Sequence, residues 1–301
     1  MKTRKPIVVD LFAGCGGLSL GFIEAGYDVV GALENWKPAI DTYRANFAHP
    51  VIEFDLLDVE AAIAVIRERF RPEVVIGGPP CQDFSIANNK KTAKRANLTM
   101  SFARIAMGVG AKLIVMENVY NIERYPVLKR VLNLLREGGY GVSQTVIDAS
   151  RVGVPQMRRR YFLVAVKGGK DDLVVADLEN NLSEERTTVR DYFKDSLGTD
   201  YYYAHPRSYH RRAIFSVDEP AATIRRVNRP IPKNYKTHPA DKCSPNEGVR
   251  PLTTSERARI QTFPTEFKFV GSTAQKEQLI GNAVPVLLAR YVASAVKKHI
   301  R

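Results

Sequence analysis

Cysteines, long apolar runs and acidic side chains are all scarce in this chain. Its 301 residues include 3 cysteines, an odd number too small for a disulfide framework, which favours a reducing compartment. No uninterrupted apolar run approaches the ~20 residues that span a bilayer. The basic start, MKTRKPIVVDLF, is interrupted by Asp10 and shows no small-residue cleavage pattern. These absences predict a soluble protein of the cytoplasm, without signal peptide or membrane span.

The shortage of acids leaves a strongly basic protein. There are 45 Lys and Arg against 32 Asp and Glu, which gives a net charge of +13. Such a surplus favours a polyanionic partner, although ribosomal, membrane-surface and nucleic-acid-binding proteins all share it. The contents of 45% hydrophobic and 26% charged residues are ordinary, which excludes collagen, coiled coil and wholesale disorder.

Strand and helix patterns alternate along the first half of the chain. We expect strands near 6–9, 28–33, 51–54, 73–76, 112–116, 142–147 and 161–166, and helices near 18–25, 37–47, 59–70, 126–137 and 285–299. This alternation predicts an α/β fold with a doubly wound, mostly parallel sheet. The pattern fades after Lys167, so we expect a large domain at 1–167, a smaller loop-rich lobe at 168–250, and a return to the large domain at 251–301.

The ends of the first three strands carry residues suited to an adenosine-bearing ligand, because ligands of open parallel sheets bind beyond the carboxyl ends of the strands. A glycine-rich turn, DLFAGCGGL, follows the first strand. Alone it fits a nicotinamide site, an S-adenosylmethionine site or a tight turn. Glu34 ends the second strand, where an acid commonly binds ribose hydroxyls, and Asp55 follows the third, where it is suited to an adenine amino group or to a helix cap.

The next strand ends carry reactive groups. Two prolines precede Cys81 in GGPPCQ and fix the backbone that presents its thiol, which is a strong nucleophile as thiolate. Glu117 ends the fifth strand and is suited to donate a proton if its pKa is raised. Alternation places Arg158 and Arg160 on one side of the following strand and Arg159 on the other.

In this order the segments DLFAGCGG, ENW, GGPPCQ, ENV, QMRRR and GNAVP resemble those of the cytosine-C5 DNA methyltransferases, of the bacterial and phage modification type. The resemblance covers about 6–167 and 219–296. It implies a Rossmann-like S-adenosylmethionine-methyltransferase sheet and a small target-recognition lobe. It also implies S-adenosylmethionine as cofactor, S-adenosylhomocysteine as product, and no metal.

The resemblance further implies a role for each matching residue. Cys81 would attack C6 of a flipped-out cytosine, protonated Glu117 would hold its N3 edge, Arg160 would bind the base carbonyl, and Arg158 would orient the base and Cys81. The residues that resemble cofactor contacts are Phe12, Gly14, Cys15, Gly16, Gly17, Leu18, Glu34, Asn35, Trp36, Asp55, Leu56, Asn282 and Ala283. Either Asn35 or Trp36 would cover the adenine.

Three stretches without acids, 84–116, 201–217 and 220–239, are candidates for contacts with double-stranded DNA. The candidate residues are Ser85, Lys90, Lys91, Lys94, Arg95, Arg207, Arg211, Arg212, Arg225, Arg226 and Arg229. The segment SIANNKKTAKRAN lacks periodicity, which predicts a loop. The resemblance implies that this loop closes over DNA, although the segment lacks the family's usual glycines. Thr262 stands where the family commonly has glycine, and we expect a local adjustment of the backbone.

These features predict a monomeric enzyme of the bacterial cytoplasm or nucleoid that methylates C5 of cytosine in a specific duplex sequence. A separately acting restriction endonuclease would be its partner in a restriction-modification system. Two alternatives remain: a tRNA cytosine-C5 methyltransferase of the same family, and a catalytically silent nucleic-acid-binding protein. An NAD dehydrogenase would explain the glycine loop but would leave PPCQ and GNAVP without a role.

Overall fold

The computed structural model describes residues 4–80, 90–208, 210–245 and 247–300, and at 90–97 the backbone alone. Seven strands form one sheet in the order β3-β2-β1-β4-β5-β7-β6. They are β1 (Ile7–Leu11), β2 (Asp28–Glu34), β3 (Val51–Glu53), β4 (Val74–Gly77), β5 (Leu113–Val119), β6 (Tyr140–Asp148) and β7 (Arg159–Lys167). Strands β1 to β5 pair in parallel, whereas β7 runs antiparallel to both β5 and β6. The prediction of a doubly wound, mostly parallel α/β sheet is confirmed.

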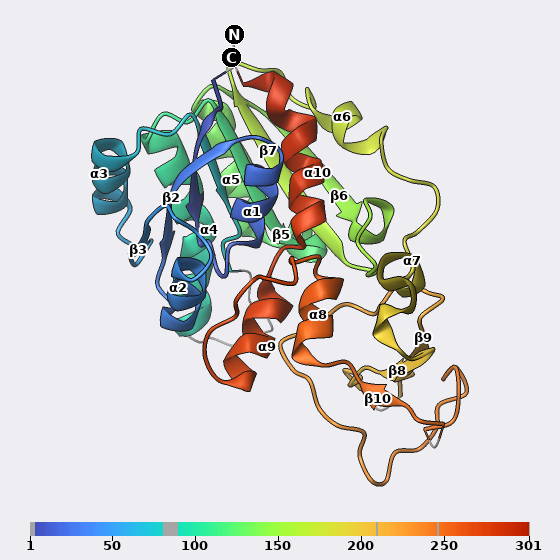
Figure 1. Ribbon diagram of the computed structural model, residues 1–301. Coiled ribbons are helices and arrows are strands. Elements are labelled where there is room, and N and C mark those ends of the chain that lie inside the picture. Colours follow the sequence, from blue (N-terminus) through green and yellow to red (C-terminus); the bar gives the residue numbers. More distant parts are fainter. Residues whose placement is uncertain (1–3, 81–89, 209, 246, 301) are drawn as a thin grey trace.

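Helices cover both faces of this sheet (Figure 1). They are α1 (Gly17–Glu24), α2 (Lys37–Arg44), α3 (Val59–Arg69), α4 (Lys90–Gly108), α5 (Pro126–Glu137) and α10 (Val286–Val296). Alternation along β1 sends Val8 into the apolar cluster under α1 and α10, and Val9 into the cluster under α3, α4 and α5. We call the sheet and these helices the sheet lobe.

Helix α4 corrects one prediction. The segment expected to be a loop, SIANNKKTAKRAN, includes the first turns of α4, which begins at Lys90. Lysine, alanine and arginine are good helix formers, so these turns form although the apolar periodicity that anchors the helix, with buried Phe102 and Ile105, starts later. Residues 85–89 of that segment lie outside the described residues.

The chain after β7 builds a smaller, less regular part, placed below the sheet in Figure 1. A three-stranded sheet of order β10-β8-β9 forms its centre. Its elements are α7 (Val189–Phe193), β8 (Tyr201–Tyr203), β9 (Ile214–Ser216) and β10 (Arg250–Pro251). We call residues 189–251 the second lobe. The short helix α6 (Val175–Glu179) precedes it and packs on the sheet lobe, where Leu178 joins the cluster under α10.

Two helices lead back from the second lobe to α10. These are α8 (Thr254–Ile260) and α9 (Thr273–Asn282), and each starts with a capping box, formed by Thr253 with Glu256 and by Ser272 with Gln275.

The described chain contains one stretch, Thr273–His299, that is long and apolar enough to span a membrane by composition. It consists of α9, α10 and a last 3-10 turn (Lys297–His299), and 67% of its most apolar window is buried in the molecule. Helices α9 and α10 are therefore buried to the extent expected of helices in the core of a folded protein.

Candidate active site

The turn between β1 and α1 adopts backbone conformations that suit glycine. Gly14 and Gly16 have φ of 56° and 95°, and Phe12 holds a φ of 58° without being glycine. A Cβ atom on Gly14 would meet nothing within 4 Å, whereas one on Gly17 would lie 2.3 Å from the carbonyl oxygen of Val284. The turn is therefore open at Gly14 and packed directly against the GNAVP segment at Gly17.

Glu34, at the end of β2, organises this turn. Its Oε2 accepts a hydrogen bond from the Gly14 N–H at 2.8 Å, and its Oε1 accepts from the N–H groups of Asn35 and Trp36, each at 2.9 Å. A carboxylate has about four acceptor positions, so these three bonds leave room for one more donor such as a hydroxyl. Asn35 is exposed and Trp36 is half-buried against the cluster around Cys15. The choice between Asn35 and Trp36 for the adenine stays open.

Asp55 does not cap helix α3, although its position also allowed that role. Helix α3 is capped by Asp58, whose carboxylate accepts from the Ala61 N–H at 3.2 Å. The exposed carboxylate of Asp55 accepts instead from the Leu57 N–H at 3.2 Å. Leu56 is 2% exposed and belongs to the core, so its side chain is not open to a ligand.

The other predicted cofactor residues divide into buried and exposed groups. Cys15, Leu18 and Ala283 have buried side chains, and the Cys15 thiol lies 3.9 Å from the carbonyl oxygen of Leu279. Burial raises the pKa of the Cys15 thiol to about 12. Asn282 is exposed at the end of α9. Within the whole predicted cofactor set, the exposed polar side chains are those of Asn35, Asp55 and Asn282, and the carboxylate of Glu34 is half-buried.

Sequence reasoning missed a buried carboxyl group beneath the turn. Asp10 is fully buried, and burial raises its pKa to about 7. Its Oδ2 accepts from the Ser19 hydroxyl at 2.7 Å, and hydrogen bonds of 2.7 Å continue from Ser19 to Tyr43 and from Tyr43 to His49. The second oxygen, Oδ1, is buried without a hydrogen-bond partner among the described residues. Asp10 belongs to an apolar run in the sequence, and no spacing pattern signals this chain of polar contacts.

Glu117 and Arg160 form a buried ion pair where β5 and β7 lie side by side. The Arg160 Nε lies 2.9 Å from the Glu117 Oε1. Burial raises the pKa of Glu117 above its ordinary value, although the charges of Arg160 and Arg158 oppose the rise. A Cβ on Gly78 would lie 3.2 Å from the other oxygen of Glu117. The carboxyl group therefore faces the backbone that leads to Cys81.

Asn118 connects these strand ends to the double proline. Its Nδ2 donates to the Pro79 carbonyl oxygen at 3.1 Å, and its Oδ1 accepts from the Val119 N–H at 2.9 Å. This bond fixes the chain two residues before Cys81. Cys81 itself and Ser85 lie outside the described residues.

Arg158 and Arg160 have different surroundings, although alternation put both on one side of the chain. Arg158 is 1% exposed, and its guanidinium donates to the carbonyl oxygens of Ile224 at 3.0 Å, Gly281 at 3.1 Å and Ala283 at 2.9 Å. Its Nε has no hydrogen-bond partner among the described residues. Arg158 thus ties the start of β7 to the second lobe and to the joint between α9 and α10.

Two glutamines reinforce this joint. The Gln156 Nε2 donates to the Gln261 Oε1 at 2.7 Å, and its Oε1 accepts from the Ile224 N–H at 2.8 Å. Gln261 in turn donates to the carbonyl oxygens of Ile280 and Ala283. A Cβ on Gly281 would lie 2.4 Å from the backbone of residue 225, so only glycine allows this close approach.

The predicted DNA-contact residues differ in the exposure of their side chains and in the contacts that those side chains already make. Arg207, Arg211, Arg226 and Arg229 are exposed. Arg212 is half-buried, forms two hydrogen bonds with the Glu219 carboxylate and lies over the ring of Phe215. Arg225 donates to the carbonyl oxygen of His205. For Lys90, Lys91, Lys94 and Arg95, the side chains lie outside the described residues.

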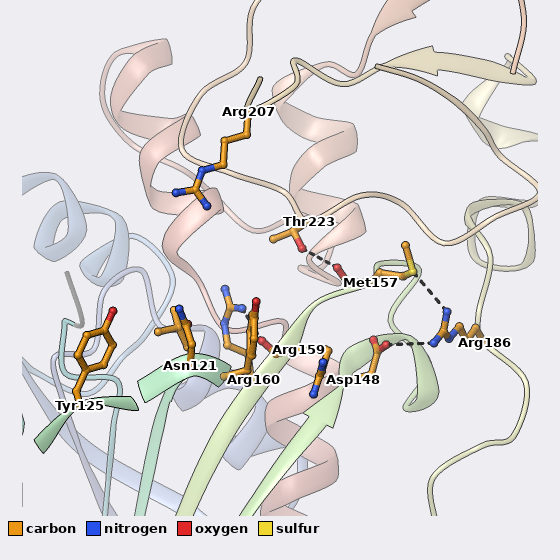
Figure 2. A pocket seen from close by; sticks show the side chains of 11 residues that line it. Asn121, Tyr125, Asp148, Met157, Arg159, Arg160, Arg186, Arg207 and Thr223 are labelled. Atoms are coloured by element: carbon orange, nitrogen blue, oxygen red, sulfur yellow. Dashed lines mark hydrogen bonds and ion pairs between the residues drawn. The ribbon is translucent and has the colours of Figure 1, made fainter. Parts of the chain in front are cut away.

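A pocket of about 510 Å³ opens beside the Glu117–Arg160 pair, between the sheet lobe and the second lobe (Figure 2). It is lined by Val119, Tyr120, Asn121, Tyr125, Asp148, Met157, Arg159, Arg160, Arg186, Arg207 and Thr223. Sequence reasoning missed Tyr120, Arg159, Arg186 and Thr223, because single residues from four separate segments give no local pattern.

Comparisons with known proteins agree with this architecture. A family model described as C-5 cytosine-specific DNA methylase matches residues 7–298. The Type II methyltransferase M.HgiDI of Herpetosiphon aurantiacus is 49% identical over 293 residues, which are 97% of this chain and 94% of that protein. The Type II methyltransferase M.HindV of Haemophilus influenzae is 48% identical over 290 residues, which are 96% of this chain and 95% of that protein.

Solved structures show the same fold. The Dnmt2 methyltransferase of S. pombe aligns with a TM-score of 0.73 at 18% identity, over 98% of this chain and 99% of that chain. A DNA modification methyltransferase encoded within an E. coli prophage aligns with a TM-score of 0.72 at 23% identity, over the same shares of the two chains.

Proposed function

Because the chain belongs to the C-5 cytosine-specific DNA methylase family and is a methyltransferase, we propose that it methylates C5 of a flipped-out cytosine in a specific duplex sequence, with Cys81 as nucleophile. The observation that carries this proposal is the buried pair of Glu117 and Arg160, 2.9 Å apart, facing the Gly78–Pro80 backbone that leads to Cys81. A site of this kind offers a proton donor and a cation to a base beside a thiol.

The residues at the ends of β1 to β3 fit S-adenosylmethionine. The turn is open at Gly14, and Glu34 keeps an acceptor position for a ribose hydroxyl. The exposed carboxylate of Asp55 is suited to the adenine amino group. When bound, this cofactor supplies the methyl group that C5 receives.

The protein's own groups prepare the cytosine for that transfer. The Cys81 thiolate forms a bond to C6, and the displaced electron pair moves toward N3, where Glu117 in its protonated form donates. Burial raises the pKa of Glu117 above its ordinary value, which favours the protonated form that this step uses. Arg160 keeps this carboxyl group in place and presents its guanidinium to the base carbonyl. As C5 takes the methyl group, the N3 proton returns to Glu117. Transfer of the C5 proton to water then restores the C5–C6 double bond and expels the Cys81 thiolate.

Arg158 acts differently in this proposal. Its guanidinium is occupied by three carbonyl oxygens of the protein, so it orients the site by holding the second lobe against β7. The buried Nε, without a partner among the described residues, is the part of Arg158 left for the base or for the residues around Cys81.

The partner in this proposal is double-stranded DNA, because extrusion of a base costs a few kcal/mol that contacts with the duplex must offset. The exposed arginines of the second lobe, Arg207, Arg211, Arg226 and Arg229, are suited to these contacts. We assign target recognition to about 168–250, between the catalytic segments 1–167 and 251–301. The protein would act as a monomer in the bacterial cytoplasm, with a restriction endonuclease acting separately.

The test is covalent trapping. Bisulfite sequencing of DNA and RNA from cells that express the protein identifies the target, and a duplex of that sequence with 5-fluorocytosine should form an adduct at Cys81 when the cofactor is present. Cys81→Ala should abolish both adduct and turnover while S-adenosylmethionine binding persists. Cys243→Ser is the matched control, because Cys243 lies in the second lobe, and it should keep the adduct. Turnover by Cys81→Ala would refute the nucleophile, and modified RNA with unmodified DNA would refute the substrate.

The proton donor has a test of its own. Glu117→Gln keeps the shape of the side chain but cannot transfer a proton, so we expect a loss of roughly 10²–10⁴-fold in the single-turnover rate. The affinity for S-adenosylmethionine, measured by calorimetry, should change little. An unchanged rate would remove Glu117 from the proton-transfer step.

A further inference from the structure

The pocket beside the Glu117–Arg160 pair is strongly basic. Four arginines and one acid, Asp148, line it. Arg160 is paired with Glu117, and Arg186 lies 3.9 Å from the Asp148 carboxylate. Arg159 and Arg207 are exposed and have no carboxylate within ion-pair distance among the described residues. The lining therefore keeps uncompensated positive charge.

The volume and the lining of the pocket are suited to a ligand larger than a simple ion. The volume of about 510 Å³ lies within the range of roughly 300–1,000 Å³ that is typical of small-molecule sites. Apolar surface is present as well, because Tyr120 and Met157 are 45% and 37% exposed. Cations together with an exposed ring and thioether suit a nucleotide, whose phosphate is anionic and whose base is flat.

Arg159 occupies the centre of this arrangement. Its guanidinium lies over the Tyr120 ring, 5.1 Å from the ring centroid. Beyond this cation–π contact, the Arg159 guanidinium donates no hydrogen bond to the described residues, so its N–H groups are available to an anion. Met157 and Thr223 stand beside it, joined by a 2.6 Å hydrogen bond from the Thr223 hydroxyl to the Met157 carbonyl oxygen.

Both parts of the molecule contribute to the pocket. Figure 2 shows Arg207 reaching down from the second lobe, while Arg186 enters from the right, next to Asp148 and Met157. A ligand held here would therefore bridge the lobe that carries the catalytic groups and the lobe proposed to recognise the target.

We propose that this pocket binds the phosphodiester-linked nucleotide next to the target cytosine, with the Arg159 guanidinium on its phosphate and Tyr120 as the platform that positions Arg159. This inference rests on the proposed function, because it assumes that the neighbouring pair holds the flipped cytosine. It assigns to Arg159 a positioning role for the substrate strand, separate from the roles of Arg158 and Arg160.

The first experiment measures duplex binding and turnover for Arg159→Ala. Loss of a charge-assisted phosphate contact should weaken duplex binding roughly 10-fold at 50 mM salt and reduce the slope of log K against log salt by about 0.9. The rate constant for methylation at saturating DNA should stay within about twofold. Arg159→Lys should keep the salt slope but lose part of the affinity, because lysine cannot stack its charge on Tyr120 in the same way.

Arg130→Ala is the matched control. Arg130 is exposed on α5, away from the pocket, so it removes the same charge without removing the proposed contact. If Arg159→Ala and Arg130→Ala give equal affinities and equal salt slopes, the pocket is not a phosphate site. If Arg159→Ala lowers the saturating rate and leaves the affinity unchanged, Arg159 acts on the reaction and the proposal is also wrong.

The second experiment locates the nucleotide. In a series of target duplexes, one phosphate at a time near the cytosine is replaced by an uncharged methylphosphonate. The native protein should lose affinity at one adjacent position, and Arg159→Ala should show no further loss at that position because the contact is already gone. Independent losses at every position would overturn the assignment. Adduct formation at Cys81, measured on the same preparations, separates failure of this inference from failure of the proposed function.

Discussion

The sheet lobe and the second lobe are stabilised by different means, although one continuous chain forms both. The sheet lobe buries two apolar clusters, one on each face of the sheet, and its elements are long and regular. The second lobe has three strands of at most 3 residues, with long connections between them. Its smaller apolar clusters are supplemented by side chains that bind the backbone directly.

Asp241 shows how the second lobe is held. Its Oδ1 accepts from the N–H groups of Ala213 and Ile214, each at 2.9 Å, and its Oδ2 accepts from the Tyr235 hydroxyl at 2.6 Å and the His238 N–H at 2.7 Å. One carboxylate therefore joins the start of β9 to the loop at 235–241 and also fixes that loop. Apolar burial is non-directional and tolerates many sequences, whereas an anchor of this kind depends on one residue.

The largest effect is expected where the two lobes meet. Glu277, on α9, is 4% exposed and forms a buried ion pair with Arg257 on α8. Removal of one partner leaves an uncompensated buried charge, so Glu277→Ala should lower the free energy of unfolding by about 3–5 kcal/mol. Urea unfolding followed by circular dichroism measures this change.

A double substitution sharpens this result. Arg257→Met combined with Glu277→Leu replaces the pair by apolar side chains of similar size, and it should recover most of the stability lost in Glu277→Ala. If Glu277→Ala lowers the free energy of unfolding by less than about 1 kcal/mol, the Arg257–Glu277 pair does not hold the junction between the lobes.

The sheet lobe could be predicted from the sequence because its signals are local. Apolar runs such as IVVDL and LIVMENV give the strands, and Val286, Ala289, Val292 and Val296 give the buried face of α10. Helix α4 could not be predicted at its start, because its first turns carry no apolar stripe. Helices α8 and α9 were signalled only by their capping boxes.

The site was predictable in its residue types but not in its contacts. The resemblance assigned Glu117 and Arg160 to one base, and the structure pairs them directly, while Arg159 contacts the Tyr120 ring. Alternation could not show that Arg158 is occupied by carbonyl oxygens of Ile224, Gly281 and Ala283, because these partners lie 66 to 125 residues away. Side-chain partners at such separation leave no trace in a local pattern.

A second prediction concerns the pH dependence of stability that Asp10 gives to the sheet lobe. The buried Asp10 has a pKa raised by burial to about 7, so the folded protein keeps a proton there that the unfolded chain releases near its ordinary value of 3.8. The stabilising contribution is full below about pH 4 and is lost as pH rises to about 7. A shift of this size corresponds to a loss of up to about 4 kcal/mol.

Asp10→Asn should remove this part of the pH dependence. The amide has no titratable proton, so the variant should match the native protein near pH 4 and exceed it in stability near pH 8. Urea unfolding between pH 4 and 8 gives the comparison. Parallel pH curves for the two proteins would show that Asp10 does not titrate in this range.

A third prediction addresses the second lobe. Asp241→Ala leaves the N–H groups of Ala213, Ile214 and His238 without their acceptor, which should cost about 1–3 kcal/mol, reduced by the partial exposure of the site. The loss should be confined to the second lobe, so DNA binding should weaken while S-adenosylmethionine binding persists. Hydrogen exchange resolved by segment measures it. Equal loss of protection in β1 and β4 would show that the two lobes unfold as one unit.

The smallest effect is expected at Thr262, which joins α8 to the start of α10. Thr262 holds a φ of 60°, the left-handed region that glycine favours. Its hydroxyl donates to the Gln261 carbonyl oxygen at 2.7 Å and accepts from the Leu287 N–H at 3.0 Å. These bonds offset a strain of roughly 1–2 kcal/mol for a residue with a Cβ in this conformation.

Two substitutions at Thr262 separate strain from hydrogen bonding. Thr262→Val keeps the strain and removes the hydroxyl, so it should lower the free energy of unfolding by about 1 kcal/mol. Thr262→Gly loses the same bonds but relieves the strain, so its stability should stay close to that of the native protein. Thermal unfolding of the three proteins decides between them. If glycine destabilises as much as valine, the backbone at 262 carries no strain, and the hydroxyl alone explains why threonine is accommodated there.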